Sequence, residues 1–159
     1  MSCPYKIVLQ RGVPAKGIPP AVSFRKWGIM ALAEQKRQKR GKTSAEVTIR
    51  VVTADEMTDL NGRYRHKKYP TNVLSFPLSS PSDAKLVGDI VICAEVVARE
   101  AKIQKKSPRA HFAHMVVHGM LHLLGHDHEK EAEALVMEAE EIRILSACGF
   151  PDPYGGGCS

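Results

Sequence analysis

Apolar and polar residues alternate along two segments in the first third of the chain, residues 5–9 and residues 45–52. Period-two alternation is typical of β-strands with one buried face. The apolar side of the second segment consists of Val47, Ile49 and Val51. Residues 72–78 predict a third, shorter strand. Pro77 lies within it and has no N–H to donate, which favours an edge position or the end of that strand.

Residues 86–93 form the most apolar run of the chain, Leu-Val-Gly-Asp-Ile-Val-Ile-Cys. A run of this length without alternation predicts a strand buried on both faces. Five other segments carry helical periodicity or helix boundary signals. They are residues 20–41, 53–64, 94–104, 109–124 and 129–147.

Caps and apolar stripes describe these helices further. Thr53 and Glu56 have the spacing of a capping box, in which each side chain satisfies a free backbone N–H of the first helical turn. Gly41 and Gly149 are the predicted stop signals of the first and last helices. The predicted apolar stripes are Trp27, Met30 and Ala33 in the first helix, Met57, Leu60 and Tyr64 in the second, and Leu135, Ile142 and Leu145 in the last, where the glutamates are expected to face solvent.

The fold class predicted by these elements is α+β, with a single domain over residues 1–150. We expect a mixed, roughly four-stranded sheet packed with helices, one of them a buried metal-binding helix. A chain of 159 residues can bury a core without disulfides. Residues 151–159 include three consecutive glycines and predict a flexible tail.

The helix predicted at residues 109–124 has an unusual composition. It contains no Lys, Glu or Asp between His111 and Gly125, so we expect it to be largely buried. Its polar stripe consists of His111, His114, His118 and His122. Burial keeps imidazoles neutral, and neutral imidazole is the form that binds metal ions.

Two of these histidines have the spacing of metal ligands. His118 and His122 are one helical turn apart on the same face. Gly125 can take the positive φ that turns the chain back, so His128 could add a third nitrogen. Three protein ligands and one open position are typical of a catalytic zinc site. The alternative is a set of core histidines bonded to backbone carbonyls, which would suit a single histidine better than three at this spacing.

Charge is distributed unevenly along the chain. Residues 1–110 hold 21 Lys and Arg against 9 Asp and Glu, whereas residues 111–159 hold 2 against 8. The basic part favours polyanions, with nucleic acid as the leading candidate and a lysine-rich solvated surface as the alternative. The four cysteines are scattered and form no C-x-x-C pair, and the sequence has no signal peptide and no membrane-spanning apolar run. We therefore expect a cytoplasmic protein that neither binds a membrane nor uses a small organic cofactor.

The positions of His118, His122, Gly125 and His128 match the zinc-protease pattern H-E-x-x-H-x-x-G-x-x-H, except that Gly119 replaces its glutamate. Without that carboxylate, peptide hydrolysis by the protease mechanism is not expected. A metal there can still polarise an oxygen, and a phosphodiester would gain from nearby cations. The candidate phosphate-binding cations are Arg63, Arg65, Lys67 and Lys68.

Four sequence blocks resemble the YbeY family of bacterial endoribonucleases. They are Leu60-Asn61-x-x-Tyr64-Arg65, Pro70-Thr-Asn-Val-Leu-Ser-Phe-Pro77, Gly88-Asp89-Ile90 and His118-Gly-x-Leu-His-Leu-x-Gly125-x-Asp127-His128. The last block is highly specific, whereas the N-terminal third matches only in its strand and helix layout.

The resemblance implies a zinc-dependent, single-strand-specific endoribonuclease with one Zn²⁺ per chain. It implies a role in ribosomal RNA maturation, notably at the 3′ end of the small-subunit RNA, and in ribosome quality control, with the small subunit and its proteins as partners. His118, His122 and His128 match the family's zinc ligands. Arg65 matches its functionally important arginine, with phosphate binding as the expected role.

The general base and two histidines remain open. Asp127 and Asp89 are both candidate bases, but Asp127 could instead orient a ligand imidazole or cap the following helix. The family usually has tyrosine at the position of His126, whose ring we expect to point away from the metal. His114 is expected to support a ligand or to belong to the core.

Two other functions compete with RNA cleavage. One is a ribosome-assembly factor that binds RNA without cutting it and holds a structural metal. The other is a metallopeptidase, which the absence of a carboxylate at Gly119 makes the weaker candidate. Structural zinc sites usually have four protein ligands, often cysteines, and the nearest cysteines in sequence, Cys93 and Cys148, lie outside the motif.

Overall fold

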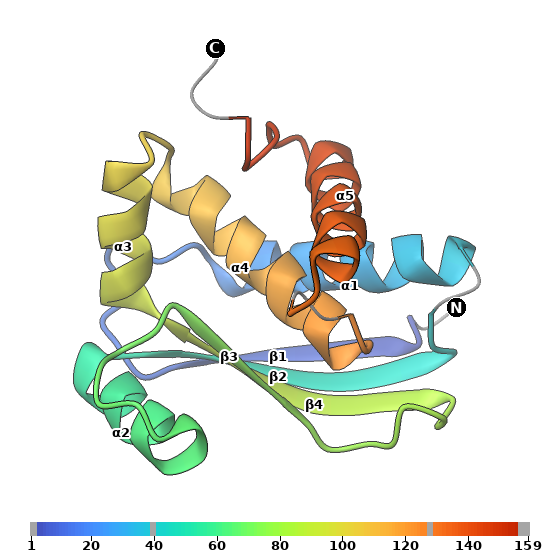
Figure 1. The fold of residues 1–159 in the computed structure, drawn as a ribbon, viewed down its shortest axis with the longest axis horizontal. Coiled ribbons are helices and arrows are strands. Elements are labelled where there is room, and N and C mark those ends of the chain that lie inside the picture. The colour runs from blue at the N-terminus through green and yellow to red at the C-terminus, as the bar shows by residue number, and fades with distance from the viewer. Residues whose placement is uncertain (1–2, 39–40, 127–128, 156–159) are drawn as a thin grey trace.

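The computed structural model describes residues 3–38, 41–126 and 129–155. Within these ranges it has four strands and five helices (Figure 1). They are, in chain order, β1 (Tyr5–Arg11), α1 (Ala21–Arg37), β2 (Ser44–Val52), α2 (Ala54–Arg65), β3 (Val73–Pro77), β4 (Lys85–Cys93), α3 (Ala94–Ile103), α4 (Pro108–Leu123) and α5 (Glu131–Ala147). The predicted α+β class is confirmed.

The strands form one mixed sheet in the order β1-β2-β4-β3. β1 and β2 are parallel, as are β2 and β4, whereas β3 runs antiparallel to β4. Pro77 ends β3 at the edge of the sheet, where a missing N–H costs least. Both predicted positions for this proline are therefore confirmed together.

The central strand β4 is covered on both faces in its second half. Ile90 and Ile92 belong to the main core beneath α1, α4 and α5, whereas Val91 and Cys93 belong to a smaller cluster with Met57 of α2. Figure 1 shows α1, α4 and α5 above the sheet and α2 at its other side. The prediction of a strand buried on both faces is confirmed for this half of β4.

Helix α4 crosses the sheet at close range because residue 119 is glycine. A Cβ at Gly119 would lie 2.9 Å from Ile90 Cγ2 and 3.2 Å from Ser75 Oγ. The hydroxyl of Ser75 donates to the Gly119 carbonyl at 3.1 Å, which ties α4 to the edge strand β3. The helix that carries the histidines is thus fixed against β3 and β4, and its predicted burial is confirmed.

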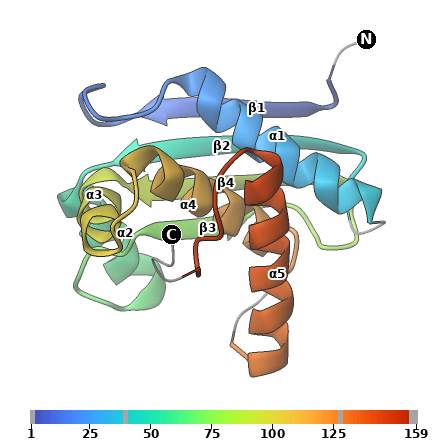
Figure 2. The ribbon, with the colours of Figure 1, turned by 90° about the horizontal axis from the view of Figure 1, so that it is seen from above.

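The apolar stripes of three helices differ from those predicted. In α2, Met57 is buried as expected, but Tyr64 is 62% exposed and contacts only the edge of the Phe76 ring among the described aromatic residues. In α1, Trp27 is buried as expected, but Ala33 is exposed and the buried ridge runs instead through Phe24, Ala31 and Leu32. In α5 the buried residues are Met137, Glu140, Glu141, Ile144 and Leu145, whereas Leu135 is 62% exposed. The first half of α5 extends beyond the body of the protein, so its apolar residues lack a surface to pack against (Figure 2).

Among the described residues, none of the helices combines the length and the apolar character needed to cross a membrane.

Candidate active site

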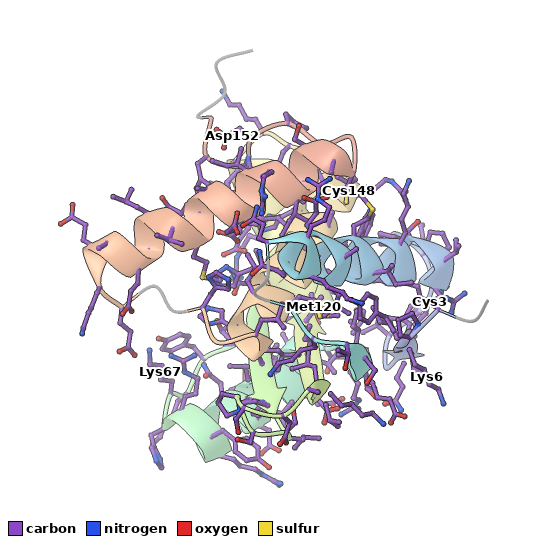
Figure 3. The ribbon with its side chains drawn as sticks, turned by 90° about the vertical axis from the view of Figure 1, so that its right-hand side faces the viewer. Cys3, Lys6, Lys67, Met120, Cys148 and Asp152 are labelled. Carbon is purple, nitrogen blue, oxygen red and sulfur yellow. The ribbon has the colours of Figure 1, made fainter. Side chains whose placement is uncertain are left out.

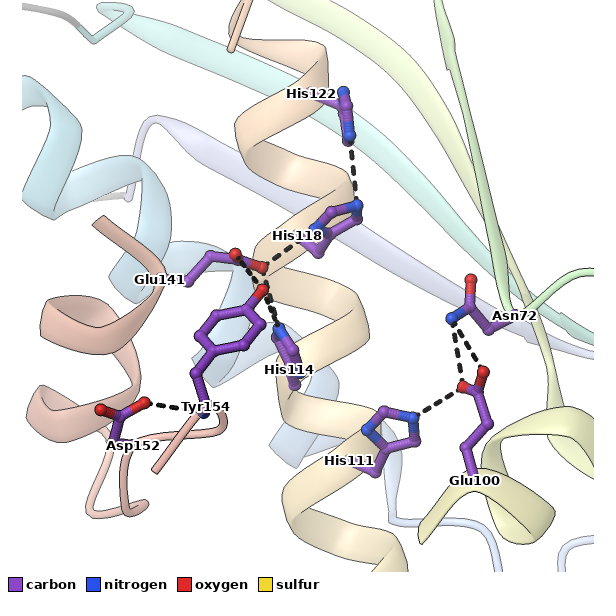
Figure 4. A network of polar contacts seen from close by, with 9 residues as sticks. All are labelled: Asn72, Glu100, His111, His114, His118, His122, Glu141, Asp152 and Tyr154. Atoms are coloured by element: carbon purple, nitrogen blue, oxygen red, sulfur yellow. Dashed lines mark hydrogen bonds and ion pairs between the residues drawn. The ribbon is translucent and has the colours of Figure 1, made fainter. Parts of the chain in front are cut away.

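The four histidines of the predicted polar stripe form a row along α4, a helix whose residues are mostly buried. Ser107 caps α4 by accepting a hydrogen bond from the backbone N–H of Ala110, and Pro108 occupies the first turn. From there His111, His114, His118 and His122 follow one another along the helix (Figure 4). The helix ends before Gly125, whose φ of 97° confirms the predicted turn.

His118 and His122 turn their Nε2 atoms toward each other at a distance of 3.1 Å. Two imidazole nitrogens bound to one zinc ion at 2.0–2.1 Å in tetrahedral geometry lie about 3.3 Å apart. The pair is therefore already close to the spacing that a shared metal requires. This donor set fits the metal that the sequence predicts, although the third predicted ligand, His128, lies outside the described residues.

Glu141 of α5 sets the proton position on His118. Its Oε2 lies 2.9 Å from His118 Nδ1 and 2.9 Å from His114 Nε2, and its side chain is 1% exposed. Burial raises the pKa of Glu141, but the hydrogen bonds from His114 and His118 outweigh burial and lower it to about 2. An ionised carboxylate can only accept hydrogen bonds, so His118 carries its proton on Nδ1 and keeps the Nε2 lone pair for a metal.

Tyr154 completes the surroundings of this carboxylate. Its hydroxyl donates to Glu141 Oε1 at 2.6 Å and lies 3.2 Å from His114 Nε2. Burial, together with the negative charge of Glu141, raises the pKa of Tyr154, so the phenol keeps the proton that it donates. The segment after α5 thereby contacts the histidine row from the side opposite α3 (Figure 4).

A second group of possible metal ligands overlaps the first. His114, His118 and Glu141 each offer a ligand atom, and these atoms lie within 4.8 Å of one another. This cluster could hold a metal ion, and its 2.9 Å contacts are also those of ordinary N–H···O hydrogen bonds. His118 belongs to both groups, with Nδ1 toward Glu141 and Nε2 toward His122. Of the two groups, only the His118–His122 pair has both imidazoles on the main cleft.

That cleft has a volume of about 670 Å³ and runs between α4, β3 and the loop after α2. Arg65 and Lys67 line it together with His118 and His122. The loop is held by the side chain of Asn61, which donates to the Tyr69 carbonyl at 2.7 Å. Lys67 lies on the same side of the molecule as the first turns of α5 (Figure 3). Two cations and the imidazole pair thus share one open space.

The other two predicted cations do not line this cleft. Arg63 points along α2 and pairs with Asp59 at 3.2 Å, and Lys68 is exposed in the loop. Alternate positions on a helix face different directions, which separates Arg63 from Arg65. The structure therefore brings together two of the four cations with the histidines.

Two of the remaining candidates, Asp89 and His126, lie in different places. Gly88 and Ile90 face α4, so the alternation along β4 directs Asp89 to the other face of the sheet, away from the histidines. His126 lines the cleft, and its Nε2 lies 2.7 Å from Gln35 Oε1 of α1. Asp127 lies outside the described residues.

Sequence reasoning missed Glu141 and Tyr154. Glutamate was expected on the solvent side of the last helix, yet Glu141 lies four residues after Met137 and three before Ile144, on the buried stripe. An acid at a core-facing helical position was the signal that could have found it, because a buried carboxylate needs hydrogen-bond donors. Tyr154 follows the helix by seven residues, and no periodicity places it.

Comparison with known proteins agrees with this geometry. The family model described as Endoribonuclease YbeY matches residues 18–149. A protein of Nitrosococcus oceani named Endoribonuclease YbeY is 49% identical over 150 residues, which is 92% of this chain and 94% of that protein. A Stenotrophomonas maltophilia protein of the same name is 49% identical over 156 residues, covering 94% and 93%.

The fold has also been seen in solution. A solved structure from Thermotoga maritima matches 96% of this chain and 99% of its own, with a TM-score of 0.59 and 23% identity. That likeness concerns the fold alone. The family model and the curated relatives cover most of the chain, including the histidine helix and the cations of the cleft. The chain belongs to the YbeY family of endoribonucleases.

Proposed function

We propose that this chain is a zinc-dependent endoribonuclease that cuts single-stranded RNA, with His118, His122 and His128 as the ligands of one Zn²⁺. The observation that carries the proposal is the 3.1 Å approach of two imidazole Nε2 atoms in a cleft that also contains Arg65 and Lys67. Zinc ligands and phosphate-binding cations in one open space suit a phosphodiester substrate.

Each residue of the cleft has a role in this proposal. A bound zinc ion would supply Lewis-acid chemistry to the reacting phosphodiester and its attacking water. Arg65 binds the phosphate through its planar guanidinium and opposes the charge that develops there. Lys67 adds a second positive charge to the path of the RNA, and Arg63 and Lys68 contact phosphates farther along the strand. Glu141 holds the His118 ring in the orientation that exposes Nε2.

The position of the cleft supports a single-stranded substrate. Its volume of about 670 Å³ lies between α4 and the edge strand β3. The loop after α2, which the Asn61 side chain holds, forms another side. An RNA duplex is recognised across its broad minor groove, whereas single strands present phosphates and unstacked bases to such spaces. The resemblance to the YbeY family implies ribosomal RNA as the substrate. We therefore include in the proposal a cytoplasmic role in maturing the 3′ end of the small-subunit RNA and in ribosome quality control.

A metallopeptidase role fits the helix less well. The protease pattern needs a glutamate at position 119, next to the first histidine ligand. That position faces the sheet here, and even a Cβ would meet Ile90 at 2.9 Å. A glutamate at this place would have to displace β4 before it could reach the cleft.

The proposal is tested by metal content and cleavage measured on the same preparations. The parent protein is expected to carry about one zinc per chain, and to cut single-stranded RNA but not casein. A chelator should abolish cleavage, and added zinc should restore it. The His122→Ala variant is expected to lose most of its zinc.

A structural metal without catalysis would give a different result. In that case the parent protein would bind zinc and RNA, yet leave the RNA intact with and without chelator. A matched control is Glu46→Gln, which removes one exposed charge on the open face of the sheet. This variant should keep both its zinc and its cleavage rate, whereas retention of zinc by His122→Ala would remove this residue from the ligand set.

A further inference from the structure

A smaller pocket of about 270 Å³ adjoins the cleft. Asn72 and His118 line both spaces, so the two lie next to each other at the His118 ring. An RNA strand whose phosphate lies at the His118–His122 pair can therefore direct a neighbouring group into the smaller pocket. At this volume it lies below the ~300–1,000 Å³ typical of sites for larger ligands, and it suits one flat ring system.

The charge of the smaller pocket differs from that of the cleft. Among the described residues, those that line it include Glu100 but no lysine or arginine. A phosphate would be repelled by this carboxylate, whereas a hydrogen-bond donor would be attracted. The pocket thus accepts a part of the RNA that carries N–H groups and no charge, which is the edge of a base.

Glu100 is held in place and keeps acceptor capacity. Its Oε1 accepts hydrogen bonds from His111 Nε2 at 2.8 Å and from Asn72 Nδ2 at 3.1 Å. Burial lowers the pKa of His111, so the neutral ring donates through Nε2. The other oxygen, Oε2, has Asn72 Nδ2 at 3.4 Å, a longer contact. Since each carboxylate oxygen offers two lone pairs, Oε2 can accept from a ligand.

The other side of the pocket offers an aromatic surface. Tyr154 is 45% exposed and lies edge-on to His114, with ring centroids 5.4 Å apart. Its hydroxyl is fixed by Glu141, so the ring is positioned in advance. Aromatic side chains bind single-stranded bases by stacking, whatever the base. Pro153 and Tyr154 lie just beyond residues 18–149, which the family model matches.

We propose that this pocket binds the base next to the cleaved phosphate and selects bases that carry an exocyclic amino group, such as cytosine and adenine. Glu100 Oε2 accepts from the amino group, and Tyr154 stacks on the ring. Glutamate accepting from the cytosine amino group is a known pairing in nucleic-acid recognition. Uracil presents a carbonyl oxygen at the same position, which faces the carboxylate unfavourably. The inference rests on the proposed function, because it places the phosphate at the His118–His122 pair.

Binding of labelled hexanucleotides of cytidine, adenosine and uridine tests the inference, with chelator present to prevent cleavage. The parent protein is expected to bind the cytidine and adenosine strands about tenfold more tightly than the uridine strand, because a hydrogen bond to a charged group is at stake. Glu100→Gln keeps an Oε1 for His111 and Asn72 but replaces Oε2 by a donor. This variant should lose the preference and gain affinity for the uridine strand.

Controls separate the base pocket from the rest of the site. Glu46→Gln also removes one negative charge, at an exposed position, and should keep the parent's preference. Tyr154→Leu should weaken all three strands about equally, whereas Tyr154→Phe keeps the ring but loses the hydroxyl that Glu141 fixes, and should retain more affinity than Tyr154→Leu. Cut sites mapped on a mixed single-stranded RNA should fall beside cytidine and adenosine in the parent and shift toward uridine in Glu100→Gln.

Two results would overturn the inference while leaving the proposed function standing. One is cleavage and binding of all three strands with equal strength by the parent protein. The other is an unchanged preference in Glu100→Gln. Failure of the zinc-loaded parent to cut any of the strands would instead overturn the proposed function, and the base pocket with it.

Discussion

Arg65 and Arg63 are two residues apart on α2, yet only Arg65 lines the cleft. Arg63 is directed along the helix, where it pairs with Asp59. An exposed ion pair of this kind contributes little to stability. The two arginines therefore offer a comparison of the same side chain with and without access to the cleft.

Replacing Arg65 by alanine is expected to lower RNA cleavage on the order of a hundredfold, as loss of a charge-stabilising donor does in other enzymes. Zinc content should not change, and the free energy of unfolding should shift by less than about 0.5 kcal/mol because the side chain is exposed. Single-turnover cleavage, metal analysis and urea denaturation measure these three quantities. Arg63→Ala should cleave within a fewfold of the parent, because a phosphate contact outside the cleft affects RNA binding more than the reaction at the histidine pair. Equal losses in both variants would mean that Arg65 has no special position in the cleft.

Because the pKa of Glu141 is shifted by folding, the free energy of unfolding of the metal-free protein is expected to depend on pH. This pKa is lowered from 4.5 to about 2 in the folded state, so the unfolded chain takes up the proton first. The stabilisation is then complete above pH 4.5 and is lost as the pH falls toward 2. A shift of this size corresponds to on the order of 3 kcal/mol for a group that is almost fully buried.

The comparison of the parent with Glu141→Gln isolates this contribution. Denaturant unfolding at pH 6 should show the variant to be less stable, and the gap should shrink by about 1.4 kcal/mol at pH 3.5, one unit below the unfolded pKa. A gap that stays constant between the two pH values would show that the loss comes from packing and not from the ionised carboxylate.

At the level of single residues, sequence patterns found the groups that lie on one helix but not those that arrive from elsewhere. His118 and His122 share a helical face, so their spacing was sufficient to predict their approach. Arg65 was singled out by its match to the family's important arginine, since no local pattern distinguishes it from Arg63. Glu141 reaches His118 only through the packing of α5 on α4, which depends on tertiary contacts that spacing within α5 does not encode.

At the level of elements, the strands were predicted more accurately than the helix faces. The alternation in β2 reports burial directly from Ala45 to Val51, because its two faces differ in environment over that stretch. Helix α5 packs with only part of its length, so its exposed Leu135 and buried Glu141 contradict a stripe drawn from hydrophobicity alone. Where α5 extends beyond the body of the protein (Figure 2), its apolar residues do not face a core, so their pattern does not predict burial.

Helix α4 approaches the sheet so closely at Gly119 that a larger residue there is expected to lower the stability of the protein. Alanine is favoured over glycine inside helices by about 1 kcal/mol, but here its Cβ would lie 2.9 Å from Ile90 Cγ2, an atom that cannot rotate away freely. Overpacking costs typically about 1–3 kcal/mol. Gly119→Ala should therefore lower the free energy of unfolding despite its better helix propensity, as measured by urea denaturation.

Gly62 in α2 is the matched control. A Cβ there would meet only the Lys67 carbonyl, at 3.5 Å, which is ordinary contact. Gly62→Ala should stabilise the protein by about 0.5–1 kcal/mol. If both substitutions stabilised the protein, α4 would have room to spare above Ile90, and the close approach described here would be wrong.

At the level of the whole molecule, the cations and the histidines of the cleft come from different parts of the chain. Residues 1–110 supply the net positive charge and both cations of the cleft, whereas the acidic remainder supplies the histidines and Glu141. The cleft forms where these two parts meet, between α2, β3 and α4. Composition predicted a polyanionic partner, but only the tertiary fold brings Arg65 and Lys67 to the histidine pair.

This arrangement predicts that RNA binding depends steeply on salt. For single strands the logarithm of the binding constant falls with the logarithm of salt by about 0.7 for each phosphate neutralised. With roughly three to five phosphates bound, we expect a slope of about −2 to −3.5, measured by fluorescence titration between low and physiological salt. Lys67→Ala should reduce the magnitude of that slope by about 0.7, because this side chain lines the cleft.

Lys85 provides the corresponding control, since it is exposed on β4 and already pairs with Glu46 at 3.0 Å. Lys85→Ala should leave the slope unchanged although the net charge falls by the same amount. An equal reduction in both variants would mean that RNA responds to the total charge of the protein and not to the cations of the cleft. A flat salt dependence in the parent would go further, because the basic residues would then serve only to hydrate the surface. The lysines whose loss alters the slope would therefore trace the path of the RNA, and Lys67 is expected to be one of them because it lines the cleft.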